Sequence, residues 1–178
     1  MKYNFAIILS KEINDKCVSI SRDLYVKNNG LFELGNDENF AHITVAHFEC
    51  DDISNLENVV EQFEELLSQQ NSFDLIQDGY RLNNGWLDVS FIISERLQKL
   101  YEGVLVLLDN NNCTKTSDDW KKNPPHITLT KFEGDTIFDI NELPKYDFSF
   151  TISELGVFEL GEYGTNKKLL KQFYIKKL

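Results

Sequence analysis

The chain has 178 residues, of which 42% are hydrophobic and 12% aromatic, and it carries a net charge of −11 at pH 7. This composition is that of a folded globular protein and excludes an intrinsically disordered chain. A protein this acidic lacks the positive field that binds long duplex nucleic acid, although a local pocket can still take a short nucleotide.

The first part of the chain predicts a buried strand, an amphipathic helix and a second strand. Residues 5–10 (FAIILS) form a short apolar run that ends in a polar residue. Apolar residues then recur at helical spacing from Ile13 to Leu24, and we expect Gly30 to stop this helix. Residues 40–48 (FAHITVAHF) are expected to form the next strand.

A second helix follows this strand. Ser54 and Glu57 stand three residues apart, as in a capping box, so we expect Ser54 to cap the helix. The apolar residues behind them fall on one helical stripe: Leu56, Val59, Val60, Phe63, Leu66 and Leu67. The first half of the chain therefore has the order strand, helix, strand, helix.

The second half predicts a similar series of elements. Residues 72–93 contain two strand-like runs around the turn signal NNG, and Ser94 is placed to cap the helix that follows. A polar loop over 114–125 leads to another strand that begins PHITL. Residues 146–160 alternate like one long strand, and 169–175 (LLKQFYI) predict a final one.

Two short stretches of the chain are alike. AHITVAHF (41–48) and PHITLTKF (125–132) share a histidine, an isoleucine, a threonine and a later phenylalanine, and they lie nearly half the chain apart. The chain has only three histidines, so two matched motifs by chance would be unusual. We interpret the two halves as an internal repeat of one α+β unit, with two lobes that face each other.

The repeat suggests a shared catalytic cleft. Alternate residues of a strand project from the same face, so His42 lies beside Thr44 and His126 beside Thr128. A pseudo-twofold axis would bring the four side chains together. Two imidazoles can supply the base and the acid of phosphodiester cleavage, while the threonine hydroxyls donate hydrogen bonds to the phosphate.

We expect structural roles, and not catalytic ones, for the other notable residues of the two motifs. Strand parity places His47 on the face opposite to His42, so we expect it to be structural or exposed. Phe48 and Phe132 fall on the histidine face by the same count, but we expect them to pack in the core. A zinc site is disfavoured because the sequence lacks clustered Cys, His or carboxylate ligands.

Compartment and thiol state are predicted from the same sequence. No apolar run reaches the length of a membrane span, and the first residues lack the pattern of a secretory signal. Cys17, Cys50 and Cys113 are widely spaced and form no C-x-x-C pair. We therefore expect a cytoplasmic protein without membrane contact, with all three cysteines as reduced, packed thiols.

The paired HITV and HITL motifs resemble the H-x-T/S signatures of the 2H phosphoesterase superfamily, which includes the RNA 2′,3′-cyclic phosphodiesterases first described as 2′-5′ RNA ligases. The resemblance extends over most of the chain: NFAIILS is similar to the family's opening strand, NPPHITLTKF to its second motif, and residues 155–175 to its closing strands. It implies an α+β, bilobal fold in which two pseudo-symmetric lobes with antiparallel sheets flank a central cleft, with the helices outside.

The resemblance also implies an activity and a set of site residues. Family members cleave phosphodiesters without metal or other cofactor, so His42 and His126 take the acid and base roles and Thr44 and Thr128 bind the phosphate. Several members hold the nucleotide base with an aromatic or basic residue. Our candidates are Tyr163 and, just before the second motif, Trp120 with the basic pair Lys121 and Lys122.

The expected function is hydrolysis of 2′,3′-cyclic phosphates or of 2′-5′ bonds in nucleotides or RNA ends, by a monomer. Two alternatives remain open. One is a phosphodiesterase of signalling oligonucleotides, such as 2′-5′ oligoadenylate or cyclic oligonucleotides. The other is a protein that binds a nucleotide without cleaving it. The sequence leaves open which histidine is the acid.

Overall fold

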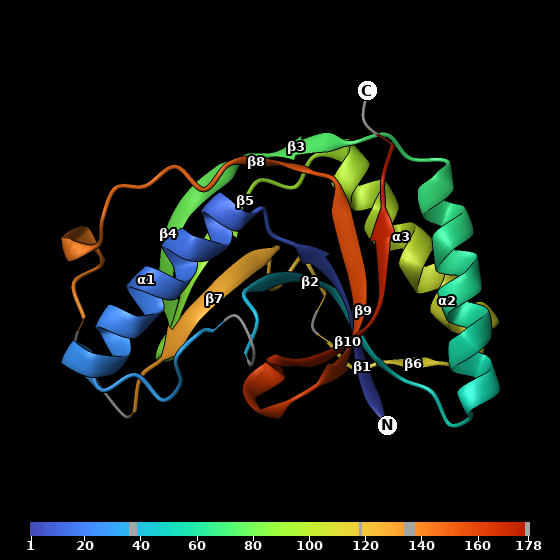
Figure 1. Cartoon of the computed structure of the whole chain (residues 1–178), viewed down its shortest axis with the longest axis horizontal. Coiled ribbons are helices and arrows are strands. Elements are labelled where there is room, and N and C mark those ends of the chain that lie inside the picture. Colours follow the sequence, from blue (N-terminus) through green and yellow to red (C-terminus); the bar gives the residue numbers. More distant parts are fainter. Residues whose placement is uncertain (36–38, 118, 134–137, 177–178) are drawn as a thin grey trace.

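The computed structural model describes residues 1–35, 39–117, 119–133 and 138–176, and it describes Tyr163 without its side chain. The fold is α+β, with two main antiparallel sheets and helices outside them, as expected from the sequence (Figure 1). The larger sheet has the strand order β10-β9-β1-β2-β6, with β1 Lys2–Ile8, β2 His42–Glu49, β6 Thr114–Lys115, β9 Glu154–Leu160 and β10 Asn166–Tyr174. The smaller sheet has the order β4-β5-β7, with β4 Gln77–Asn83, β5 Trp86–Phe91 and β7 His126–Lys131.

The remaining elements connect or cover these sheets. Two short strands, β3 (Phe73–Leu75) and β8 (Phe150–Ile152), pair with each other. The helices are α1 (Lys11–Asn28), α2 (Ile53–Ser68) and α3 (Glu95–Asn110), with short 3-10 helices η1 (Ile140–Glu142) and η2 (Glu162–Gly164).

Helices α1 and α3 each cover the sheet that carries the histidine motif of the other half of the chain, whereas α2 packs on the larger sheet of its own half. Helix α1, from the first half, packs on β7 of the smaller sheet. Helix α3, from the second half, packs on β2 of the larger sheet, beside α2. Figure 1 shows this exchange, with α1 at one end of the molecule and α2 and α3 together at the other. Each lobe therefore contains elements from both halves of the sequence.

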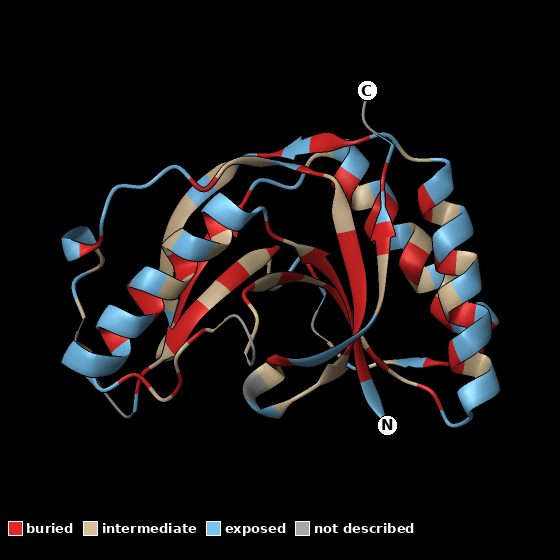
Figure 2. Ribbon diagram, in the orientation of Figure 1, coloured by how far each residue is buried: buried red, intermediate tan, exposed pale blue. Residues whose placement is uncertain are grey.

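Aromatic packing joins the larger sheet to α2. The ring of Phe5 on β1 lies 4.7 Å from that of Phe48 on β2 and 4.2 Å from that of Phe63 on α2. Phe63 in turn meets the ring of Phe173 on β10 edge-on, at 5.0 Å. The buried residues line the inner faces of the helices and sheets (Figure 2). Burial of each such side chain stabilises the fold by about 2 kcal/mol.

The helix termini agree with the sequence predictions except at one cap. Ser94 caps α3 as predicted, since its Oγ accepts a hydrogen bond from the backbone N–H of Leu97 at 3.2 Å. The prediction that Ser54 caps α2 is wrong: the cap is Asp52, whose carboxylate accepts from the N–H of Ser54 at 3.0 Å. A carboxylate there also interacts favourably with the positive end of the helix dipole.

The single long strand expected over 146–160 is two strands in different sheets. Strand β8 pairs with β3, and β9 pairs with β1 in the larger sheet. The chain changes sheets at Ser153, whose carbonyl accepts a hydrogen bond from the N–H of Ile175 at 2.9 Å. The apolar residues fall on even positions up to Ile152 and resume on the odd positions Leu155 and Val157, so a change of phase in the alternation marks the break.

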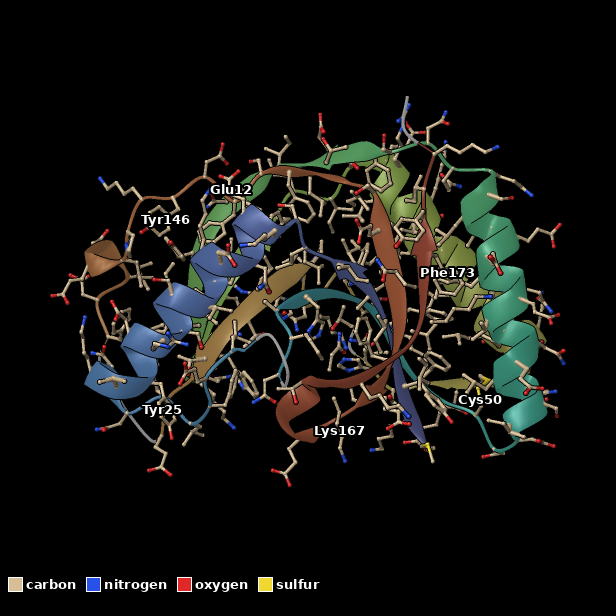
Figure 3. All side chains as sticks on the ribbon, viewed as in Figure 1. Glu12, Tyr25, Cys50, Tyr146, Lys167 and Phe173 are labelled. Carbon is tan, nitrogen blue, oxygen red and sulfur yellow. A yellow bond between two sulfur atoms is a disulfide. The ribbon has the colours of Figure 1, made fainter. Side chains whose placement is uncertain are left out.

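The expectation of three reduced thiols is wrong for two of the cysteines. Cys50, just after β2, forms a disulfide with Cys113, just before β6, while Cys17 is a buried free thiol (Figure 3). The spacing of 63 residues carries no sequence signal for this pair. The pairing of β2 with β6 brings the two residues together and holds the start of the loop before β7 against β2.

The disulfide gives a prediction about stability. Replacing both Cys50 and Cys113 by serine should lower the free energy of unfolding by about 2–4 kcal/mol, because the crosslink restricts the unfolded chain. Urea titration followed by circular dichroism measures this change, with Cys17→Ser as the matched control that keeps the crosslink. Thiol titration of the unreduced, unfolded protein should find only Cys17; three titratable thiols would contradict the crosslink.

Candidate functional site

The first histidine motif lies on β2, paired with β1. In the register of the two strands, His42 is opposite Ile8 and Thr44 is opposite Ala6. The register then shifts by one residue, with Val45 as the extra residue on β2. Val45 and the alanine after it are both buried, as expected at a β-bulge, where two residues face one of the neighbouring strand.

The second motif repeats this register on β7, paired with β5. His126 is opposite Ser90, Thr128 is opposite Asp88, and Leu129 is the extra residue of an equivalent bulge. Each motif therefore consists of a histidine and a threonine on one face of a strand, followed by a bulge. The internal repeat predicted from sequence is present in this local geometry.

The bulge changes the position of His47. The prediction that His47 lies opposite to His42 is wrong, because the extra residue reverses the alternation of the strand. His47 lies on the same face as His42 and Thr44 and lines the same cleft. Phe48 and Phe132 turn instead into the core, where they are 0% and 2% exposed, which confirms that they pack there.

Both catalytic candidates are held by the backbone in the same way. The Nδ1 atom of His42 lies 2.7 Å from the carbonyl oxygen of Phe40, and the Nδ1 atom of His126 lies 2.8 Å from that of Pro124. A carbonyl can only accept, so Nδ1 is the protonated nitrogen of each ring. Nε2 of each ring is therefore the nitrogen available for proton transfer in the cleft.

The two motifs line one cleft between the sheets. Its volume is about 560 Å³, within the range of sites for small molecules. His42 and Thr44 line it from the larger sheet, and His126 and Thr128 line it from the smaller one. The convergence of these four side chains predicted from sequence is thus present in the structure.

The imidazoles of the larger sheet are uncharged at neutral pH. Burial lowers the pKa of His42 from 6.5 to about 4, although its hydrogen bond to the Phe40 carbonyl acts in the opposite direction. The pKa of His47 is also lowered to about 4, chiefly by burial and in addition by the nearby His42 and His126. This side of the cleft therefore presents neutral proton acceptors.

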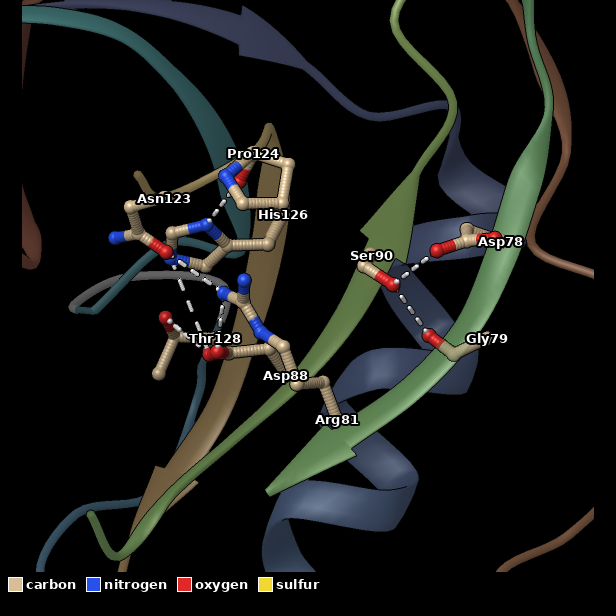
Figure 4. A network of polar contacts seen from close by, with 9 residues as sticks. All are labelled: Asp78, Gly79, Arg81, Asp88, Ser90, Asn123, Pro124, His126 and Thr128. Atoms are coloured by element: carbon tan, nitrogen blue, oxygen red, sulfur yellow. Dashed lines mark hydrogen bonds and ion pairs between the residues drawn. The ribbon is translucent and has the colours of Figure 1, made fainter. Parts of the chain in front are cut away.

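The smaller sheet contributes a buried charge network that sequence reasoning missed (Figure 4). Asp88 is 3% exposed; its carboxylate accepts hydrogen bonds from Thr128 Oγ1 at 2.9 Å and from an Nη2 of Arg81 at 3.0 Å. The same Nη2 lies 2.8 Å from Oδ1 of Asn123. Asp88 Oδ1 is also 3.9 Å from Nε2 of His126.

A pattern in the sequence pointed to this aspartate. In the stretch WLDVSF, Trp86, Asp88 and Ser90 alternate with three apolar residues that are buried. A carboxylate inside an otherwise apolar strand is rare unless it is paired. Its alternation with a tryptophan and a serine would have placed it on the polar face, toward the cleft.

Comparisons with known proteins support the fold. The chain matches no protein-family model, and no curated protein matches it in sequence. Its structure is similar to that of E. coli LigT, solved in complex with 3′-AMP, with a TM-score of 0.74 and 16% identity over 98% of this chain and 97% of that one. This is the LigT fold. TT0787 of Thermus thermophilus (TM-score 0.69, 16% identity, 99% of both chains) and the MHV ns2 PDE domain (TM-score 0.57, 14% identity, 96% and 99%) share it.

Of the other predicted contacts, Trp120 and Lys122 line this LigT-fold cleft. Trp120 lines the cleft but is only 5% exposed, because its ring stacks on that of Tyr101 at 4.3 Å. Lys122 lines the cleft and is exposed, whereas Lys121 is exposed but is not among the described lining residues. The side chain of Tyr163 lies outside the described part of the chain. Trp86, which sequence reasoning did not single out, also lines the cleft.

Two further features concern the described ranges only. No group of three or more His, Cys, Asp or Glu side chains within them is placed to hold a metal ion. None of the helices within them is long and apolar enough to cross a bilayer.

The buried imidazoles give a prediction about stability in acid. Between pH 6.5 and about 4, the unfolded chain binds protons at His42 and His47 that the folded protein does not. The free energy of unfolding should therefore fall as the pH is lowered through this window. His47→Gln removes one of the two groups, so its Tm should fall less steeply than that of the wild type in calorimetric scans. Equal slopes would contradict a buried, neutral His47.

Proposed function

We propose that the protein is a phosphodiesterase that hydrolyses 2′,3′-cyclic phosphates, or 2′-5′ phosphodiester bonds, of nucleotides and RNA ends. The observation that supports this most is the pair of histidines, held identically through Nδ1, on facing sheets of one cleft. A protein that only binds a nucleotide has no need of two proton-transfer groups. The LigT fold supports the same class of substrate, since LigT has been solved with 3′-AMP, ATP and NADP⁺.

The surroundings of the histidines support different roles for them. We assign the base to His42, because burial holds its ring uncharged and its Nε2 lone pair can accept a proton from water. We assign the acid to His126, the histidine whose Nε2 has a carboxylate oxygen, Oδ1 of Asp88, within 3.9 Å. Water then attacks phosphorus, His42 takes its proton, and His126 gives a proton to the departing 2′ or 3′ oxygen. The product is a phosphomonoester.

Other side chains in the cleft would hold the substrate. Thr44 and Thr128 are the proposed phosphate contacts on the two sheets. Arg81 and Lys122 add positive charge next to the phosphate, which the acidic chain otherwise lacks. Trp120 and Tyr163 remain our candidates for contact with the base.

The preferred substrates are small. The net charge of −11 repels long RNA, whereas a cleft of about 560 Å³ holds a nucleotide. Signalling oligonucleotides, such as 2′-5′ oligoadenylate or cyclic oligonucleotides, are the second candidate because they share this size and chemistry. We propose that the protein acts as a monomer in the cytoplasm, where the Cys50–Cys113 disulfide would be an exception to the usual reduced state.

A substrate panel tests the proposed reaction. With EDTA present, the protein should hydrolyse at least one of nucleoside 2′,3′-cyclic phosphates, 2′-5′ oligoadenylate and cyclic dinucleotides. His42→Ala and His126→Ala should each lower kcat by about 10²–10⁴-fold, since each removes a proton-transfer group. Binding of a nucleoside monophosphate, measured by calorimetry, should change little. Turnover that survives both substitutions would rule out these roles.

The acid and base roles are tested by the pH dependence of kcat/KM. Because the base must be unprotonated and the pKa of His42 is about 4, activity should persist below neutrality and fall as the pH approaches 4. Asp88→Asn removes the carboxylate beside His126 and should lower kcat, while the acid limb of the profile, which belongs to His42, stays in place. If Asp88→Asn instead moves the acid limb, the two roles are reversed.

A further inference from the structure

His47 is the third histidine of the cleft, and its place there is well fixed. Its backbone N–H donates to Oγ of Ser117 at 3.2 Å, and its carbonyl accepts from the N–H of Thr116 at 2.8 Å. Its ring packs close to Gly164, where an added Cβ would lie 3.4 Å from Cε1 of His47. The backbone of His47 is thus anchored to the loop after β6, and its ring lies beside Gly164.

The ring of His47 meets the hydroxyl of the first motif. Its Nε2 lies 3.3 Å from Oγ1 of Thr44, within hydrogen-bond distance. A threonine hydroxyl has one proton to donate and two lone pairs that accept. If Nε2 carries the proton of the neutral ring, it donates to Thr44, and the proton of the Thr44 hydroxyl remains free for the phosphate.

The second motif has the opposite arrangement. Thr128 donates its hydroxyl proton to Oδ1 of Asp88 at 2.9 Å, and an ionised carboxylate can only accept. While this bond is made, Thr128 cannot donate to a phosphate. The two threonines occupy equivalent positions beside equivalent bulges. Among the described contacts, Oγ1 of Thr44 lies near two side-chain nitrogens, Nε2 of His47 at 3.3 Å and, at the longer distance of 3.5 Å, Nδ2 of Asn4. Oγ1 of Thr128 instead donates to a carboxylate.

We propose that His47 is a positioning residue for cleavage: its Nε2–H donates to Oγ1 of Thr44, so that the Thr44 hydroxyl donates to a non-bridging oxygen of the phosphate. This inference rests on the acid–base reaction of the proposed function, and it replaces the equal phosphate-binding roles proposed above for Thr44 and Thr128 by unequal ones. Thr44 becomes the donor to the charge that develops on the phosphoryl oxygens, and Thr128 becomes the partner of Asp88. Donors of this kind act chiefly on the transition state.

Burial supports this arrangement. The pKa of His47 is lowered to about 4, so its ring is neutral at neutral pH and carries one proton, on one of its two nitrogens. A neutral donor in this position orders the hydroxyl without adding a charge beside the base, His42. Lys131 holds the equivalent position in the second motif, where its Nζ lies 4.8 Å from the centre of the Trp86 ring.

The test is a double-mutant cycle between His47 and Thr44, measured as kcat and KM on the substrate found by the panel. His47→Phe, which keeps the size of the ring, should lower kcat about tenfold with KM nearly unchanged, because a bond that directs a transition-state donor is lost. His47→Gln, whose amide N–H can replace Nε2–H, should restore most of that loss. In a Thr44→Val background, His47→Phe should have almost no further effect on kcat.

Two control variants complete the experiment. Thr44→Ser keeps a hydroxyl and should remain as sensitive to His47→Phe as the wild type. Thr128→Val should lower kcat less than Thr44→Val does. Thermal melting of each variant shows that it is folded before its rates are compared.

The outcomes separate this inference from the proposed function. If His42→Ala and His126→Ala abolish turnover but His47→Phe is equally harmful with threonine or valine at position 44, the reaction stands and the positioning role is wrong. If His47→Phe leaves kcat unchanged or raises it, Thr44 donates to His47 in the wild type, and the role is again wrong. If the two alanine variants retain turnover, the proposed function itself fails.

Discussion

The site depends on one constraint, the register of each motif strand against its neighbour. In both sheets the histidine, the threonine and the bulge meet the neighbouring strand at equivalent points, so both imidazoles lie on the cleft face. Beyond each bulge the alternation of the strand is reversed. Phe48 and Phe132 therefore point into the core, where packing holds them. A shift of one residue in either strand would turn its histidine out of the cleft and its phenylalanine out of the core.

The two motif strands have equivalent backbones, but different side chains surround their threonines. Opposite Thr44 the larger sheet has Ala6, and opposite Thr128 the smaller sheet has Asp88. One wall of the cleft is thus neutral and rich in imidazole, while the other holds a buried carboxylate neutralised by Arg81. The hydrogen bonds of His42 and His126 to the backbone are equivalent, so the two histidines differ in the charge that surrounds them.

The sequence was enough to predict the features that arise from local patterns. The alternation of a strand placed His42 with Thr44, and the repeat of the motif placed the second pair, because both depend on residues close together in the chain. The cap at Ser94 and the turn at NNG were predictable for the same reason. The resemblance to a known family supplied the arrangement of the two sheets, which local patterns do not determine.

The features that were missed depend on contacts between distant residues or on a single inserted residue. The bulge at Val45 is marked only by the adjacent apolar pair Val45 and Ala46, which reverses the alternation; strand parity counted without it assigned His47 to the wrong face. The disulfide joins residues that only the pairing of β2 with β6 brings together. The break at Ser153 coincides with a change of phase in the apolar alternation, but the pairing of β8 with β3 and of β9 with β1 depends on residues far away in the chain.

The exchange of helices between the lobes bears on how such a chain could arise. Since α1 covers the sheet of the second motif and α3 covers that of the first, neither half contains a complete core of its own. A shorter ancestor with one motif would have needed to form a dimer, in which the helix of each molecule covered the sheet of the other. The symmetry of such a dimer would have made the two walls of the cleft identical. Fusion of the two into one polypeptide removes that symmetry, and a lone aspartate on one wall is the kind of change that only a fused chain can keep.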